Sequence, residues 1–299
     1  MAQPTITRRR RPTGARAHRP RPWAVGALVL CMLMGMWAAG ARAQTTVFVT
    51  TASDVSDGDT SSATALAGNP GADGEASLRE ALEVMDENND IQVLFTGDFT
   101  INLQSDLPFV EMANNGLIDA EGQAIVLDGN GTRSGVSFLL GSNVTVRGLT
   151  FLNCANGLTA FLGTGYRIEG CTFGRPGAGN GIGLNLQGNL SATVGGTAPG
   201  AGNTFEDNDI ALQMVGPSSF TNHEVALFGN IFGVDVSGAS PPATTTGNDI
   251  AIQAVNPARA RQIGGFAHGE PNIIAGNNVG IEANNTTNTA WPSNVITQN

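Results

Sequence analysis

The chain has 299 residues, of which 41% are hydrophobic, 6% are aromatic and 13% are charged, and its formal net charge is −10. All 15 basic residues are arginines, and eight of them lie in residues 1–43, so the remaining residues carry a net charge of −18. An acidic surface of this kind excludes proteins that bind nucleic acid or anionic lipid through basic patches.

Residues 1–43 have the pattern of a secretory signal peptide. An arginine-rich segment precedes an apolar run from about Ala24 to Ala39, and Ala41-Arg42-Ala43 forms a small-x-small site before Gln44. The apolar run is short for a membrane span, although an uncleaved N-terminal anchor is the alternative. We expect cleavage near Ala43, a secreted or cell-surface protein, and no membrane span in the mature chain.

Residues 44–90 are expected to form an N-terminal cap. The pattern predicts a strand over 46–50, followed by an acidic loop rich in Asp, Gly and Ser. Apolar residues share one face of a predicted helix over 78–85, and Ser77 with Glu80 forms a capping box before it. We expect this amphipathic helix to cover the first coil of a solenoid, because the ends of a solenoid expose apolar surface.

An internal repeat dominates the rest of the chain. Residues 193–212 align without a gap with residues 262–281, at an offset of 69, and residues 146–151 align with 168–173 at an offset of 22. Periods of this size are typical of solenoids. We expect coils of roughly 20–30 residues, three of which make up the longer repeat.

The elements inside each repeat are short alternating strands, such as 182–184, 210–212 and 250–252, separated by Gly, Asn, Thr and Ser. This pattern predicts an all-β fold, a right-handed parallel β-helix over residues 91–299. Recurring asparagines are expected to stack at one turn of successive coils. These structural asparagines are Asn180, Asn208, Asn248 and Asn277.

Two further expectations follow from the repeat. Cys154 and Cys171 occupy different positions in their coils, so we expect a loop residue and a buried filler, respectively, and no disulfide. Residues 293–299 align with 224–230, where the chain continues into a further strand. We therefore expect the chain to be a fragment truncated at its C-terminus.

The segment "ASLREAL", with "TVFVTTASDVSDGD" before it and "IQVLF" after it, resembles CSLREA-type secreted proteins of the pectin-lyase-like superfamily. The resemblance covers about residues 46–299 and implies a right-handed parallel β-helix. Ala76 replaces the first cysteine of the motif, so a cross-link made by that cysteine is absent. The superfamily includes lyases, hydrolases, epimerases and adhesins, so the resemblance implies no single activity.

Arg147, Arg167 and Glu169 are the candidate catalytic residues. A polysaccharide lyase needs an arginine or lysine base on one sheet face, with carboxylates nearby. Arg147 and Glu169 occupy equivalent positions one coil apart, so they can pair. The alternative is a solvated ion pair between coils, which contributes little to stability.

Two acidic groups are candidate calcium sites. Carboxylate oxygens are the ligands that calcium prefers, but neither group has EF-hand or nonapeptide-repeat spacing, and Asp is also a common turn residue. The first group lies in the cap loop and the second lies in the repeat. The candidates are Asp54, Asp57, Asp59, Asp207, Asp209 and Asp249.

We weigh two functions. The first is an exported extracellular or cell-surface β-helix repeat protein, non-catalytic and either adhesin-like, structural or carbohydrate-binding, with a polysaccharide or a cell surface as its partner. The alternative is a polysaccharide lyase or glycoside hydrolase of the pectin-lyase-like superfamily, more lyase-like if it is an enzyme. The sequence predicts no oligomeric state.

Overall fold

The computed structural model describes residues 44–217, 224–233, 247–256, 260–264, 271–284 and 296–298. The chain divides into two units, Met1–Arg42 and Ala43–Asn299, and the described residues all belong to the second. The expected signal peptide therefore lies outside the described residues. Among those residues, no helix is long and apolar enough to cross a membrane.

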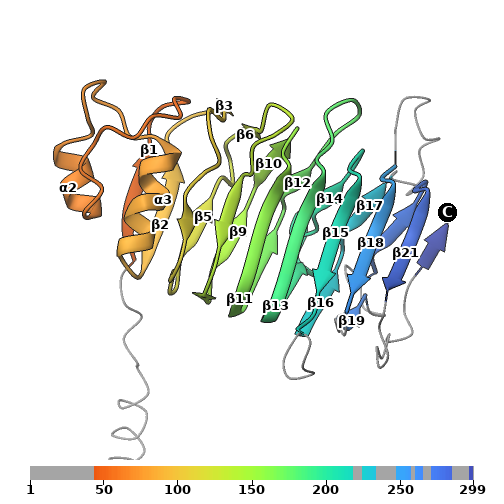
Figure 1. The fold of residues 1–299 in the computed structure, drawn as a ribbon. Coiled ribbons are helices and arrows are strands. Elements are labelled where there is room, and N and C mark those ends of the chain that lie inside the picture. The colour runs from red at the N-terminus through yellow and green to blue at the C-terminus, as the bar shows by residue number, and fades with distance from the viewer. Residues whose placement is uncertain are drawn as a thin grey trace, which may run out of the picture. The chain divides into compact units, whose positions relative to one another are not determined.

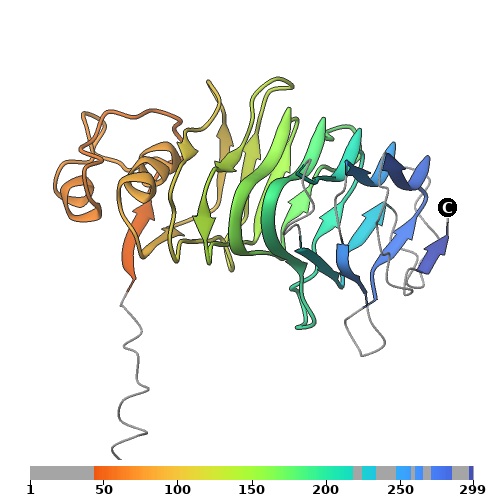
Figure 2. The same ribbon diagram turned by 60° about the horizontal axis from the view of Figure 1, so that its bottom comes forward.

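The second unit is a parallel β-helix, as the sequence predicts (Figure 1). Successive coils build one sheet of 14 strands and one of eight, with parallel pairing between coils. The larger sheet bends because β11 (Asn156–Glu169) and β13 (Ile182–Gly195) each continue through a corner, and Figure 2 shows both as long curved strands. The first part of β11 pairs with β7 and its last part pairs with β9, so the larger sheet forms two faces of each coil. The eight-stranded sheet forms the third face.

The strands of each face are as follows. The first face contains the N-terminal parts of β11 and β13 together with β4 (Phe109–Val110), β7 (Val136–Phe138), β15 (Ile210–Val215), β18 (Ile250–Val255) and β21 (Val279–Asn284). The second face contains the C-terminal parts of β11 and β13 together with β1 (Thr45–Val49), β2 (Ile91–Phe95), β5 (Leu117–Asp119), β9 (Thr145–Arg147), β16 (Glu224–Phe228) and β19 (Ala260–Ile263). The third face contains β3 (Phe99–Asn102), β6 (Ile125–Asp128), β10 (Leu149–Leu152), β12 (Thr172–Phe173), β14 (Thr204–Phe205), β17 (Ile231–Gly233), β20 (Ile273–Ala275) and β22 (Ile296–Gln298). At the corner between the first two faces, β8 (Gly141–Ser142) pairs with β11.

Inward side chains of successive coils stack on one another to form the core. Four fully buried phenylalanines of the third face, Phe151, Phe173, Phe205 and Phe232, stack with ring centroids 5.0, 4.7 and 4.6 Å apart. These distances match the spacing of hydrogen-bonded strands, so the backbone pairing itself sets the ring stacking.

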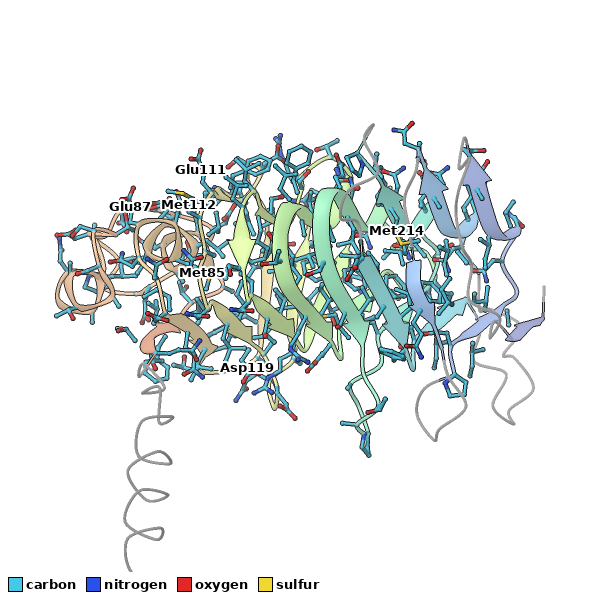
Figure 3. All side chains as sticks on the ribbon, turned by 90° about the horizontal axis from the view of Figure 1, so that it is seen from below. Met85, Glu87, Glu111, Met112, Asp119 and Met214 are labelled. Atoms are coloured by element: carbon cyan, nitrogen blue, oxygen red, sulfur yellow. The ribbon has the colours of Figure 1, made fainter. Side chains whose placement is uncertain are left out.

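The predicted cap is present at the N-terminal end. The helix α3 (Leu78–Glu87) starts at the predicted capping box of Ser77 and Glu80 and buries its apolar face, including Met85, which lies among packed side chains in Figure 3. The strand β1 starts one residue before the predicted one and pairs in register with β2, so it is the first rung of the second face. A short helix in the acidic loop, α2 (Ala63–Gly68), was not predicted.

The 69-residue repeat spans two coils, so the prediction of three coils was wrong. Val194 pairs with Leu227, and Leu227 pairs with Ile263, which is equivalent to Val194 in the repeat. The predicted register is confirmed, because each pair of equivalent residues lies at the same position of its coil. The coils differ in length: Asn203 and Asn230, stacked on each other, are 27 residues apart, whereas the next stacked pair is 42 apart.

The four predicted structural asparagines form a ladder at the corner between the third and first faces. In a typical rung, Asn208 Nδ2 donates to Asn248 Oδ1 at 2.8 Å and to the carbonyl of Phe173 at 2.9 Å. Asn208 Oδ1 accepts from the backbone N–H and from Nδ2 of Asn180, at 3.1 and 2.8 Å. All four hydrogen-bonding positions of the amide are therefore filled.

A second asparagine ladder stands at the corner between the second and third faces, so the prediction of one stacking turn was incomplete. It consists of Asn203, Asn230 and Asn272, with the same pattern of amide and carbonyl bonds. Both ladders are buried, with side chains no more than 6% exposed.

A cysteine begins each ladder. The backbone N–H of Cys154 donates to Asn180 Oδ1, and that of Cys171 donates to Asn203 Oδ1. The two thiols are free, in agreement with the predicted absence of a disulfide. Cys154 lies in the loop between β10 and β11, as expected, and is buried there at 2% exposure. Burial raises the pKa of each thiol to about 12.

Candidate functional site

The three candidate catalytic residues lie on the outside of the second face. Asp119, Arg147 and Glu169 occupy equivalent positions of three successive coils, which confirms the predicted register of Arg147 and Glu169. The close partner of Arg147 is Asp119, however, because Nη2 lies 2.6 Å from Asp119 Oδ2. Arg147 Nη1 lies 3.5 Å from Glu121, and Glu169 pairs with Arg167 at 3.7 Å.

These contacts fix the charge of Arg147. The hydrogen bond that Arg147 donates to Asp119 raises the pKa of the guanidinium, against the effect of its partial burial, and the negative charges of Asp119, Glu121 and Glu169 raise it further. Burial acts to raise the pKa of Asp119, but the bonds and charge of Arg147 and the N–H of Glu121 lower it below its ordinary value. Arg147 therefore stays protonated and is unsuited to the role of a general base.

A cleft of about 220 Å³ lies beside this cluster, between Arg147, Glu121 and Glu169 on one side and the loop 198–201 on the other. Three carboxylates surround its single arginine, so the cleft carries net negative charge and disfavours an anionic sugar. Glu111 directly follows β4 of the first face. In Figure 3, Asp119 and Glu111 lie on opposite sides of the molecule, so the cluster around Arg147 is far from this end of the first face.

The first calcium group does not converge on one point. Both carboxylate oxygens of Asp54 bond with Arg79, at 3.0 and 2.9 Å. Asp57 accepts from the N–H of Ala72, and Asp59 accepts from Ser61. Each carboxylate is thus committed to a different partner, so these residues do not fit a calcium site.

The second calcium group is also dispersed. Asp207 accepts from the N–H of Gly177 at 2.6 Å, and Asp249 accepts from Asn278 Nδ2 at 2.7 Å. Asp209 lies one coil before Asp249. In the part of the chain that the structure describes, no three His, Cys, Asp or Glu residues come together as metal ligands. These residues do not fit a calcium site either.

A different set of polar residues forms a continuous line on the first face. Its members occupy one register position on successive coils, and we call this line the amide row: Thr159, Asn185, Gln213, Gln253 and Glu282. The strand neighbours of its first four members, such as Leu212 and Met214 on either side of Gln213, are buried, so the row points outward. Gln213 Nε2 donates to Gln253 Oε1 at 2.7 Å, and Gln253 Nε2 donates to Glu282 Oε2 at 2.6 Å.

Asn185 is the member of the row with unused hydrogen-bonding capacity. Its side chain is 5% exposed, and Nδ2 donates to Asn156 Oδ1 at 3.2 Å. Within the described residues, no group donates to its buried Oδ1. A buried acceptor without a donor costs about 1–3 kcal/mol.

The surroundings of the row are partly apolar. Half-buried Val215 and Val255 follow Gln213 and Gln253 by two residues, and half-buried Ile210 and Ile250 precede them by three. The row was not predicted, but the sequence contains its signal. In each of four coils, a polar residue lies three positions after a β-branched aliphatic residue, and these aliphatic residues are Ile182, Ile210, Ile250 and Val279.

The chain matches no family model, and no curated protein or solved structure is significantly similar to it.

Proposed function

We propose that this is an exported, non-catalytic β-helix protein that binds a polysaccharide along the amide row. Amide side chains carry both donors and acceptors, as sugar hydroxyls do, so the two can pair in several orientations. The row presents one polar group per coil, at the strand spacing of about 4.8 Å, which suits a ligand with a regular repeat. The flanking valines and isoleucines can contact the apolar faces of the sugar rings.

The single observation that carries this proposal is the line of polar side chains at one outward register position on five successive coils. The fold itself needs no polar group at this outward position. Oδ1 of Asn185 is itself closed to solvent, so the contacts with a sugar fall on the half-buried side chains of Gln213 and Gln253, and each hydrogen bond made there adds to the affinity.

Charge selects among polysaccharides. The hydrogen bond from Gln253 lowers the pKa of Glu282, so the row ends in a carboxylate that is ionised at neutral pH. The residues beyond the leader carry a net charge of −18. Both features disfavour polyuronates, so the proposed ligand is a neutral polysaccharide.

The proposed location is outside the cell, either secreted or at the cell surface, with an adhesin-like role. The support is the leader pattern of residues 1–43 and the resemblance to CSLREA-type secreted proteins. Mass spectrometry of the protein recovered from the medium or the cell surface tests this point. The expected mature N-terminus is Gln44.

Affinity electrophoresis in gels that contain soluble neutral glycans tests the binding. Gln253→Leu removes the side-chain hydrogen bonds of Gln253 to its two neighbours in the row, Gln213 and Glu282, and we expect it to weaken binding about tenfold. Gln92→Leu is the matched control, because Gln92 is a half-exposed outward glutamine of β2 on the second face. Unchanged binding by Gln253→Leu, or an equal loss in the control, contradicts the proposal.

The alternative is a polysaccharide lyase or glycoside hydrolase that uses the cleft beside Arg147. The cleft and its carboxylates favour it, whereas the raised pKa of Arg147 argues against a lyase base. Incubation with polyuronates, followed by ultraviolet absorbance of unsaturated products, distinguishes the two. Activity that is lost in Arg147→Ala or Arg167→Ala replaces the binding proposal with the enzymatic one.

A further inference from the structure

The strand β1 has an open edge. Thr45 donates its N–H to Asp90, and Val49 accepts from the N–H of Thr96, both on the side of β2. Because peptide groups alternate along a strand, Thr46 and Phe48 turn their N–H and C=O groups to the opposite edge. Within the described residues, no strand other than β2 pairs with β1.

An apolar groove of about 240 Å³ runs beside this edge. The open edge of β1 forms one wall, and Ala63, Leu66 and Ala67 of α2 form another, with the segment 74–76 at one end. Phe48 lines the groove and is 53% exposed. Unpaired peptide groups beside an apolar groove are the two features that recognise an added strand: the edge bonds its backbone, and the groove accommodates alternate side chains.

The charge around the groove defines the occupant further. Residues 44–90 contain ten acidic residues and one basic residue, so their net charge is −9. This is half of the net charge of −18 that the residues beyond the leader carry. The basic residue, Arg79, already pairs with Asp54, and Glu75 lines the groove itself. A cationic segment is therefore attracted, and an acidic one is repelled.

We propose that the edge of β1 binds an extended peptide segment of a partner protein, one in which apolar residues alternate and basic residues flank them. The segment adds a strand to the second face, with its backbone paired to Thr46 and Phe48 and its apolar side chains against α2. This site is independent of the amide row, which lies on the first face, so the polysaccharide proposal and this one can fail separately.

The test uses a fluorescein-labelled peptide of alternating valine and threonine with two arginines at each end, titrated with the protein produced from the full chain. Fluorescence anisotropy should show saturable binding that weakens with added salt. A peptide that is N-methylated on the residues facing β1 should bind at least tenfold more weakly to the unaltered protein. Phe48→Pro should give a similar loss, because it removes an edge N–H without touching the bonds between β1 and β2.

Phe109→Ala is the matched control, because Phe109 is 57% exposed on the first face, and it should bind the peptide normally. The proposal is overturned if the N-methylated peptide binds as tightly as its parent, or if a peptide with glutamates in place of the arginines does so. No saturable binding by the unaltered protein also overturns it. A dimer in sedimentation velocity that Phe48→Pro dissociates identifies a second copy as the occupant and likewise overturns it.

Discussion

The asparagine ladder makes a quantitative prediction about stability. Asn208 lies inside the first ladder, 2% exposed, with Asn180 before it and Asn248 after it. Replacement by alanine removes the acceptor of two donors of Asn180, its backbone N–H and one proton of Nδ2. We therefore expect Asn208→Ala to destabilise the fold through Asn180 rather than through the lost side chain itself.

The magnitude follows from counting the groups left without partners. Phe173 O still accepts from the N–H of Glu206, and Asn248 Oδ1 still accepts from the N–H of residue 208, so neither of these acceptors is left without a donor. The part-buried carbonyl of Glu206 also loses a bond from Asn208 Nδ2. Two buried donors remain unpaired, at about 1–3 kcal/mol each, and a small cavity adds to this. The expected loss is about 3–5 kcal/mol, or roughly 10 °C in melting temperature for a chain of this size.

Thermal unfolding followed by circular dichroism measures this loss. Asn102→Ala is the control, because Asn102 is an exposed asparagine of β3, and its change should stay within about 0.5 kcal/mol. A loss below about 1 kcal/mol in Asn208→Ala, or equal losses in the two variants, would refute the argument that the ladder stabilises the coils through satisfied buried amides.

Two further predictions concern titratable groups. Because the pKa of Cys154 and of Cys171 is about 12, neither thiol should react with a disulfide reagent at pH 8 until the protein unfolds, and rapid reaction of the native protein would contradict the described burial. The pKa of Asp119 is depressed in the folded state, so its pairing with Arg147 stabilises the fold above the ordinary carboxyl pKa of about 3.9 and is lost as the pH falls through the lowered value. The free energies of unfolding of the parent and of Asp119→Asn should therefore differ at pH 5, by less than about 1 kcal/mol because Arg147 is 38% exposed, and should converge as the pH falls through the lowered pKa, whereas a constant difference would contradict this.

Much of the fold could be predicted because stacking repeats the same demand in every coil. A side chain inside a parallel β-helix contacts its equivalents one coil before and one coil after, so Phe205 and Phe232 are held to one residue type. The same applies to the buried amides, and this is why Asn180 and Asn208 were visible as a pattern. The capping box of Ser77 and Glu80 is a local motif and needs no tertiary information.

The number of coils in the repeat could not be predicted from the offset alone. Coils grow by loop insertion at corners, and the separation of stacked asparagines in the first ladder varies from 28 to 40 residues. Since a solenoid tolerates long surface loops at low cost, an offset of 69 fits two long coils as well as three short ones. The pairing of Val194 with Leu227, and of Leu227 with Ile263, shows which is correct.

The partners of the charged candidates could not be predicted for a different reason. The sequence predicted that Arg147 and Glu169 occupy equivalent positions of adjacent coils, and the strand register confirms this. Each position, however, has one equivalent neighbour in the coil before it and another in the coil after it. Asp119 on the other side competes for the same guanidinium and is the closer partner. Asp54 and Asp57 lie near each other in the sequence, yet each pairs across the cap with its own partner, Arg79 or Ala72, which sequence spacing cannot show.

The internal repeat also separates residues that the fold requires from those that it does not. Outward positions face water, so stacking alone leaves them free to vary, as Gln187, Val215 and Val255 do at one such position. The amide row stays polar over five coils at a comparable position. Bonds such as the one from Gln213 to Gln253 offer a structural reason for this, whereas the unpaired oxygen of Asn185 does not. Because Gln253→Leu removes two hydrogen bonds of the fold, it should lower the melting temperature in either case. Glycan binding by the folded variant should stay unchanged if the row serves only the coils, and it should weaken if the row also serves a ligand.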